Sequence, residues 1–205
     1  MNSNSNFTLS DAQFNRLREL LQKRTGLAIS SSRKKELQKR IAPFIHQHHD
    51  IDQLIRKLDS SYRIDQGLVN ALTIGESYFF RNHPHFEALK KEVFPSLIAR
   101  KRERKRIKIW SAGCSTGEEP YSLSILVDRD FPVLKDWDIT ILASDINTSF
   151  LKRAEEAKYT QWSFRGVDES TISRYFAQTG KNEFTLNEDI KKRVSFQQLN
   201  LSTLP

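Results

Sequence analysis

The chain has 205 residues, of which 38% are hydrophobic and 10% aromatic, so it can form one large or two small domains with packed cores. Its 33 basic residues against 25 acidic ones give a formal net charge of +8, which favours an acidic partner: nucleic acid, a membrane surface or an acidic protein. No apolar run is as long as a membrane span and the polar start lacks a signal-peptide core, so we expect a cytoplasmic protein without membrane insertion.

Hydrophobic periodicity predicts a small all-helical domain over residues 1–73. Two helices come first, and further helical patterns cover 51–58 and 64–72. The residue types that cap or end the first two helices are Ser10, Gly26 and either Ser31 or Ser32. The apolar residues that recur at helical spacing in them are Phe14, Leu17, Leu21, Leu37, Ile41, Phe44 and Ile45.

A basic cluster marks the start of the second predicted helix: Arg33, Lys34, Lys35, Lys39 and Arg40. On a helical wheel, Lys35 and Lys39 point away from the apolar stripe of that helix. A solvated helix face is the simpler interpretation of such a charge run. The alternative is a docking surface for an acidic partner.

Metal-binding and disulfide-forming residues are scarce. His46, His48 and His49 lie near a predicted helix end without a further ligand type at a suitable spacing, and Cys114 is the single cysteine. Solvated histidines near a helix C-terminus are the simpler interpretation. We therefore predict no metal site, and one cysteine excludes an intrachain disulfide.

From residue 74 onward, strand-like runs alternate with helical patterns, which predicts an α/β domain with a parallel sheet. The strand candidates are 107–109, 139–144 and 194–199. The helical stripe that precedes the first of them consists of Phe86, Leu89, Val93 and Leu97. The chain reaches Pro205 directly after the third strand, whereas a doubly wound sheet usually has more strands, so we expect the sheet to be incomplete.

A Gly-rich turn joins the first predicted strand to a helix. Gly113 and Gly117 lack the G-x-G-x-x-G spacing of a dinucleotide site, and no lysine follows them as in a phosphate loop. Glu118 and Glu119 at the helix start would repel a phosphate and attract a cationic centre. Small residues in the turn allow a ligand to approach the backbone closely.

The second predicted strand ends on Asp145, where an acid commonly accepts hydrogen bonds from ribose hydroxyls. A ribose and a cationic centre without phosphate point to S-adenosylmethionine. Simpler interpretations stand beside this one. A helix N-terminus favours carboxylates, which would explain one of the two glutamates, and Asp145 can act as a strand-end cap.

Three ordered motifs, at 73–81, 110–121 and 143–146, resemble the CheR-type chemotaxis receptor methyltransferases. The helical N-terminal module and the closing segment 196–201 extend the resemblance over nearly the whole chain. It implies a receptor-docking helical domain followed, over 74–205, by a Rossmann-like (class I) methyltransferase domain that is incomplete at its C-terminus. Members of this bacterial family transfer a methyl group from S-adenosylmethionine to chemoreceptor glutamates, leaving S-adenosylhomocysteine.

The resemblance also implies site residues. With Gly113 of the Gly-rich turn, the expected cofactor contacts are Gly75, Ser77, Arg81, Glu119, Asp145, Asn200 and Leu201. Arg81 matches an arginine beside the methyl group and is the expected catalytic residue, with a salt bridge to Glu76 or Glu87 as the simpler alternative. The family's next motif, which carries an active-site tyrosine, would lie beyond Pro205.

The resemblance favours acidic cytoplasmic helices of chemoreceptors as the partner of Arg33, Lys35, Lys39 and Arg40. We expect a monomer. We also expect no binding to nucleic acid, because the basic cluster lacks the interleaved aromatic residues of single-strand binding surfaces. Two other functions stay open. A nucleic-acid methyltransferase is compatible with the charge of +8, and a cofactor-binding or receptor-binding module without catalysis is compatible with an incomplete sheet.

Overall fold

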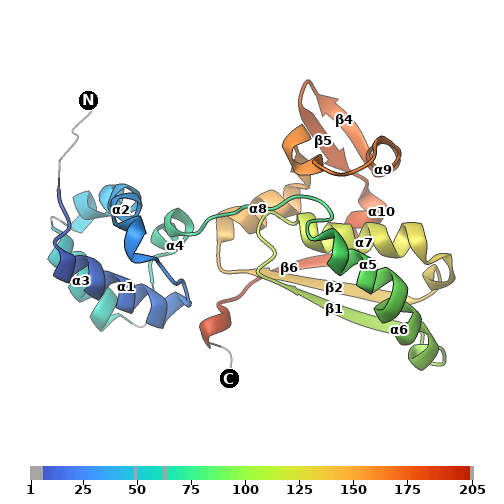
Figure 1. Ribbon diagram of the computed structural model, residues 1–205, viewed down its shortest axis with the longest axis horizontal. Helices are drawn as coiled ribbons and strands as arrows, with labels where there is room; N and C mark the ends of the chain where they lie inside the picture. The colour runs from blue at the N-terminus through green and yellow to red at the C-terminus, as the bar shows by residue number, and fades with distance from the viewer. Residues whose placement is uncertain (1–6, 49, 62–63, 204–205) are drawn as a thin grey trace. The chain divides into compact units, whose positions relative to one another are not determined.

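The computed structural model describes residues 7–48, 50–61 and 64–203 and divides into two compact units (Figure 1). One unit comprises the chain up to Ile74 together with the segment that starts at Asn200, and the other comprises Gly75–Leu199. No helix within the described ranges is both long and apolar enough to cross a membrane.

The first unit is helical, as its periodicity predicts. Its α-helices are α1 (Asp11–Thr25), α2 (Lys34–His48), α3 (Ile51–Ser60) and α4 (Gln66–Leu72), and a short 3-10 turn, η5 (Leu201–Thr203), belongs to it as well. The helices enclose one hydrophobic core, in which Leu17, Ile41 and Leu68 are fully buried.

Helix ends in this unit follow their capping residues. The Ser10 hydroxyl accepts the N–H of Gln13, whose side chain accepts the N–H of Ser10 in return, which completes a capping box. Gly26 ends α1 with a left-handed φ of 73°, as expected. The expected cap of the second helix was wrong by a residue: Ser30 caps a 3-10 turn, η1 (Ser31–Arg33), which leads into α2.

The second unit holds the predicted parallel sheet. Its strands are β1 (Arg106–Ala112), β2 (Asp138–Asp145) and β6 (Val194–Gln198), in the order β1-β2-β6. Each neighbouring pair is parallel. Helices α7 (Glu118–Asp130) and α8 (Thr148–Glu156) both contact β2 and β6, so the α/β expectation is confirmed.

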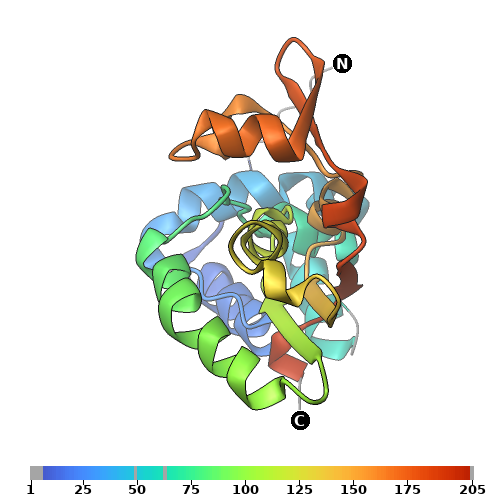
Figure 2. The same cartoon turned by 90° about the vertical axis from the view of Figure 1, so that its right-hand side faces the viewer.

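A small antiparallel sheet was not expected from the sequence. Its order is β3-β5-β4, formed by β3 (Lys158–Tyr159), β4 (Phe176–Gly180) and β5 (Glu183–Leu186). Helices α9 (Glu169–Tyr175) and α10 (Glu188–Lys191) accompany it. Helix α7 lies between the parallel sheet and the β4–β5 hairpin (Figures 1 and 2).

The helix before β1 departs from the predicted stripe. It runs as α5 (His83–Ala88), a π-helical turn η2 (Leu89–Val93) and α6 (Phe94–Lys101). The π turn holds one residue more than an α-helical turn, and this extra residue shifts the buried position from Val93 to Phe94. Val93 is 42% exposed and Phe94 only 1%, so placing Val93 on the buried stripe was wrong.

Candidate active site

The Gly-rich turn after β1 is fixed against the end of β2. The backbone N–H groups of Gly113 and Cys114 both donate to the Ser144 carbonyl, at 2.8 and 2.9 Å. Gly113, Ser115 and Gly117 have φ values of 78°, 50° and 93°, the left-handed region that glycine adopts readily. The turn therefore brings its backbone to the carboxyl edge of the parallel sheet, where open α/β sheets bind their ligands.

The two glycines of the turn have different surroundings. A Cβ on Gly113 would meet nothing within 4 Å, and Gly113 and its neighbour Ala112 are exposed. A Cβ on Gly117 would lie 2.8 Å from Cβ of Ala154 in α8. Gly117 thus permits close packing of α7 and α8, whereas Gly113 faces open space that a ligand can enter.

Asp145, at the end of β2, is held by backbone donors. Its two carboxylate oxygens accept the N–H groups of Ser115 and Asn147, each at 2.8 Å. A carboxylate has about four acceptor positions, so two remain for a ligand's hydroxyl groups. Asp145 therefore fixes the turn and can still accept hydrogen bonds from a ribose.

The paired glutamates differ in their surroundings. Glu118 is 3% exposed, and its carboxylate accepts hydrogen bonds from the Thr116 hydroxyl at 2.6 Å and the Ser163 hydroxyl at 3.2 Å. Glu119 is exposed and accepts the Ser111 hydroxyl at 2.6 Å. Glu118 is a structural anchor, and Glu119 keeps acceptor positions on the open side of the turn.

The segment 75–81 packs along the same unit. A Cβ on Gly75 would lie 2.6 Å from Cζ of Phe150, in the first turn of α8. The Phe79 N–H donates to the Ser163 carbonyl at 2.9 Å, and the Phe80 N–H donates to the Ser122 hydroxyl of α7, also at 2.9 Å. Segment 75–81 is thereby tied to both helices that follow the Gly-rich turn and β2.

Arg81 has no carboxylate partner within the described residues. It is exposed, its Nη1 donates to the Glu76 carbonyl, and its guanidinium carbon lies 5.8 Å from the centre of the Tyr78 ring. The two carboxylates considered for a salt bridge are engaged elsewhere: Glu76 pairs with Arg165 and Glu87 with Lys91. Its guanidinium therefore has donors to offer to an incoming carboxylate.

The remaining expected cofactor contacts, Asn200 and Leu201, belong to the helical unit. There the Asn200 amide donates to the Arg24 carbonyl at 2.7 Å, and Leu201 is 46% exposed. The other six expected contacts belong to the unit Gly75–Leu199.

Cys114 does not have the properties of a nucleophile. Burial, aided by the nearby charge of Asp145, raises the pKa of its thiol to about 12. Among the described residues, no group of three or more histidine, cysteine, aspartate or glutamate side chains can hold a metal ion. His49 and the side chains of His46 and His48 lie outside the described part of the chain.

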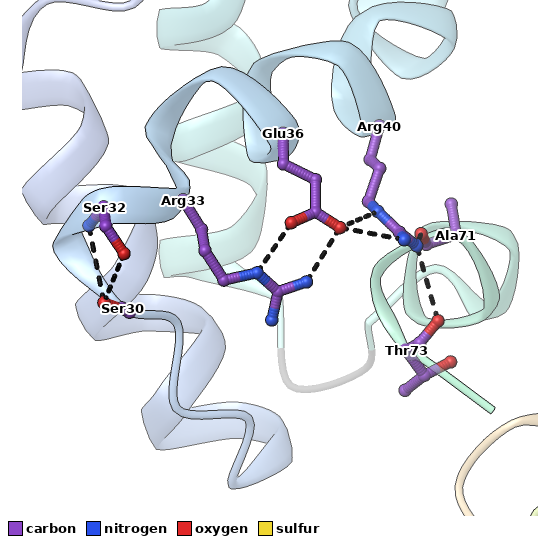
Figure 3. A network of polar contacts seen from close by, with 7 residues as sticks. All are labelled: Ser30, Ser32, Arg33, Glu36, Arg40, Ala71 and Thr73. Carbon is purple, nitrogen blue, oxygen red and sulfur yellow. Dashed lines mark hydrogen bonds and ion pairs between the residues drawn. The ribbon is translucent and has the colours of Figure 1, made fainter. Parts of the chain in front are cut away.

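Three cations of the basic cluster have partners inside the helical unit: Lys34 pairs with Asp11 at 2.6 Å, and Arg33 and Arg40 both pair with Glu36 (Figure 3). Arg33 donates twice to Glu36, at 2.6 and 2.8 Å. Arg40 also binds Glu36 and donates to the Ala71 carbonyl at 2.8 Å and the Thr73 carbonyl at 3.4 Å. The helical wheel is confirmed for the exposed pair Lys35 and Lys39.

Comparison with known proteins identifies the family. Residues 75–205 match the model described as CheR methyltransferase, SAM binding domain. The chain belongs to the CheR methyltransferase family. The matched range includes the Gly-rich turn, Glu119 and Asp145, whose open acceptor positions fit the family's cofactor, S-adenosylmethionine.

Relatives match along most of the chain. Chemotaxis protein methyltransferase 2 of Vibrio cholerae is 33% identical over 198 residues, which cover 95% of this chain and 68% of the relative. Chemotaxis protein methyltransferase 1 of Pseudomonas aeruginosa is 30% identical over 200 residues, covering 94% and 72%. The chemotaxis protein methyltransferase of Borreliella burgdorferi is 28% identical over 205 residues, covering 97% and 72%.

Proposed function

We propose that this protein transfers a methyl group from S-adenosylmethionine to glutamate side chains of chemoreceptors in the bacterial cytoplasm. As a CheR family member it is an S-adenosylmethionine-dependent methyltransferase, and its relatives are named chemotaxis protein methyltransferases. The observation that carries the choice of acceptor is Arg81, an exposed guanidinium that lacks a carboxylate partner among the described residues. It lies on a segment tied to α7 and α8.

The chemistry asks little of the protein beyond positioning. The cofactor supplies an electrophilic methyl group when bound. A glutamate carboxylate is already ionised at neutral pH, so no general base is required, and orientation alone can contribute roughly 7–11 kcal/mol. We assign Arg81 to orienting the acceptor carboxylate through charge-assisted hydrogen bonds.

The cofactor contacts follow from the chemistry of the turn. Asp145 has acceptor positions for ribose hydroxyls, Glu119 has them for a cationic amine, and the space beside Gly113 admits the ligand to the backbone. The further contacts that we propose are Gly75, Ser77, Asn200 and Leu201. The product, S-adenosylhomocysteine, would occupy the same positions.

We assign receptor docking to the helical unit. Lys35 and Lys39 are exposed and form no ion pair within the described ranges, whereas their neighbour Lys34 pairs with Asp11, so Lys35 and Lys39 can complement an acidic helix. Arg33 and Arg40 lie beside these two lysines in the sequence, and each forms an ion pair with Glu36. The protein would act as a monomer on acidic receptor helices and not on nucleic acid.

The test is transfer of radiolabelled methyl groups from S-adenosylmethionine to receptor-containing membranes, compared with RNA. Arg81→Ala should lose methylation by at least tenfold while S-adenosylhomocysteine binding is largely retained. Arg100→Ala is a matched control, because Arg100 also donates to a backbone carbonyl, that of Ser96, from an exposed site. Label in RNA, or an Arg81→Ala protein with full activity, would reject the proposal.

A binding module without catalysis is the second candidate. It would bind S-adenosylhomocysteine in calorimetry and receptor membranes in sedimentation, with no label transferred by the unsubstituted chain.

A further inference from the structure

An arginine lies over two aromatic rings beside segment 75–81. The guanidinium carbon of Arg165 is 4.1 Å from the centre of the Tyr78 ring and 4.3 Å from that of Trp162. Both distances are within the range of a cation–π interaction. Trp162 is 70% exposed, the highest fraction among the large exposed hydrophobic residues described. We call Tyr78, Trp162 and Arg165 the stacked platform.

The platform is rigidly supported from beneath. Trp162 and Arg165 flank Ser163 and Phe164, which are 8% and 2% exposed, in the 3-10 turn η4 (Gln161–Phe164). The Ser163 carbonyl accepts the N–H of Phe79, and the Phe164 ring stacks on the Phe79 ring at 5.4 Å. The turn and segment 75–81 are therefore one packed body, and an exposed tryptophan here is held in place rather than free to collapse onto the surface.

The platform is also positively charged. Arg165 and Arg81 both lie near the Tyr78 ring, with guanidinium carbons 4.1 and 5.8 Å from its centre. The carboxylate paired with Arg165 is Glu76, at 3.5 Å, and that side chain is 67% exposed. So long and exposed an ion pair is weak, and a partner carboxylate can replace it at little cost.

These properties are those of a contact site for a protein. Tryptophan, tyrosine and arginine are the residues that most often dominate binding energy at interfaces, and rigid support lowers the entropy cost of binding. The fold gains little from leaving Trp162 in water. The guanidinium groups of Arg81 and Arg165 outnumber the single carboxylate near them among the described residues, that of Glu76, which favours a partner that carries several carboxylates.

We propose that the stacked platform receives the acceptor helix of the receptor next to the glutamate that is methylated. An apolar side chain of that helix would cover Trp162, and a second carboxylate, about one helical turn from the acceptor glutamate, would bind Arg165. The inference rests on the proposed function, because it takes the acceptor to be an acidic receptor helix. Trp162 and Arg165 are then specificity-determining residues, and Arg81 remains the group that touches the acceptor carboxylate.

The test separates docking from catalysis. Initial methylation rates are measured against receptor concentration for Trp162→Ala, Arg165→Gln and Arg165→Lys in the full chain. The first two should raise KM for receptor at least tenfold, with kcat and S-adenosylhomocysteine affinity within about twofold. Arg165→Lys keeps the charge but loses the planar stack, so its KM for receptor should lie between that of the unsubstituted chain and that of Arg165→Gln. A fall in S-adenosylhomocysteine affinity that parallels the loss would place Trp162 at the cofactor and overturn the proposal.

Matched controls exist in the same unit. Val133→Ala removes another exposed apolar side chain, 62% exposed, and Arg174→Gln removes another arginine that lies over a tyrosine ring, 5.1 Å from that of Tyr175. Neither should change KM. Equal KM effects from these controls and from the platform variants would overturn the platform, as would a receptor KM unaltered in Trp162→Ala.

Sedimentation with receptor membranes, in the presence of S-adenosylhomocysteine, gives a readout without turnover. Trp162→Ala and Arg165→Gln should bind at least fivefold more weakly than the unsubstituted chain. If the unsubstituted chain binds receptor but transfers no label, the proposed function fails, while weaker binding of these variants still supports the platform. Equal binding of all variants, or no binding by the unsubstituted chain, rejects the platform.

Discussion

Gly117 packs directly against Ala154: a Cβ atom on Gly117 would lie 2.8 Å from Cβ and 3.2 Å from Cα of Ala154. The close approach joins the start of α7 to α8. The Tyr121 hydroxyl strengthens the same junction by donating to the Ala154 carbonyl at 2.9 Å. Because the Gly-rich turn ends at Gly117 and Asp145 lies just before α8, this contact sets the spacing between the two proposed halves of the cofactor site.

Gly117→Ala should therefore destabilise the protein more than Gly113→Ala. Both substitutions place a Cβ at positive φ, which costs about 1–2 kcal/mol, and only Gly117→Ala adds an overlap worth about 1–3 kcal/mol. Urea unfolding measures the difference. Gly113→Ala should instead weaken S-adenosylhomocysteine binding out of proportion to its small loss of stability. Cofactor affinity unchanged in Gly113→Ala would remove Gly113 from the site.

Substitution of Glu118 should lower the stability of the fold, whereas substitution of Glu119 should weaken cofactor binding. Glu118→Ala leaves the hydroxyls of Thr116 and Ser163 without their buried acceptor, so we expect a loss of about 2–4 kcal/mol in unfolding free energy. Glu119→Gln should change stability by less than about 0.5 kcal/mol and weaken cofactor binding roughly tenfold. Denaturation and calorimetry on the two variants decide it. The reverse pattern would show that the roles are exchanged.

The sequence predicts that Glu118 and Glu119 matter as a pair, but it does not show which of them anchors the fold and which faces the ligand. Two adjacent carboxylates at a helix start indicate a site or a cap, and only the tertiary contact from Ser163, 45 residues away, identifies Glu118 as the anchor. The parallel strands were predictable because apolar and β-branched residues recur within them at strand spacing, as in Ile107, Ile109, Ile139 and Ile141. The antiparallel sheet was not, because β3 has only two residues and the five residues of β4 do not alternate between apolar and polar.

The π turn before β1 gives a third prediction. Phe94→Ala should cost about 3–5 kcal/mol, since Phe94 is buried at 1% exposure, whereas Val93→Ala should stay within about 0.5 kcal/mol. An uninterrupted α-helix would bury Val93 with Phe86 and reverse the ranking. Thermal unfolding of the two variants measures it, and similar losses from both would argue against the π turn.

Stability should respond to acid through Glu36. Hydrogen bonds from Arg33, with the nearby charge of Arg40, lower the pKa of Glu36 from 4.5 to about 2. A depressed carboxyl pKa stabilises the fold fully above 4.5, and this stabilisation is lost as the pH falls from 4.5 through about 2. Glu36→Gln should flatten this part of the pH profile of unfolding, followed by circular dichroism.

The control for Glu36 is Glu19→Gln. The Glu19 carboxylate is 71% exposed and pairs with Arg16 at 3.6 Å, so its loss should leave the acid profile close to that of the unsubstituted chain. If Glu36→Gln retains the full slope between pH 4.5 and 2, the network in Figure 3 does not carry the acid sensitivity.

The basic cluster shows a second limit of the sequence. A helical wheel separates Lys35 and Lys39 from the apolar stripe, as the structure confirms. It cannot show that Arg40 donates to the carbonyls of Ala71 and Thr73, some thirty residues away. Of the five cations in the cluster, three are therefore paired within the helical unit, and Lys35 and Lys39 face solvent.

That division predicts how the docking surface responds to substitution. Lys35→Glu combined with Lys39→Glu should slow receptor methylation at least tenfold at low salt, because reversed charges repel an acidic helix. The loss should shrink as added salt shortens the Debye length from about 10 Å at 0.1 M to about 3 Å at 1 M. Stability and S-adenosylhomocysteine affinity should stay unchanged.

Arg33→Ala and Arg40→Ala should instead lower the stability of the helical unit, since each removes a partner of Glu36. Reversing exposed Arg102 and Arg104 changes the net charge equally and controls for it. Equal slowing by that control would assign the effect to overall charge, and no slowing by the lysine pair would reject the docking surface.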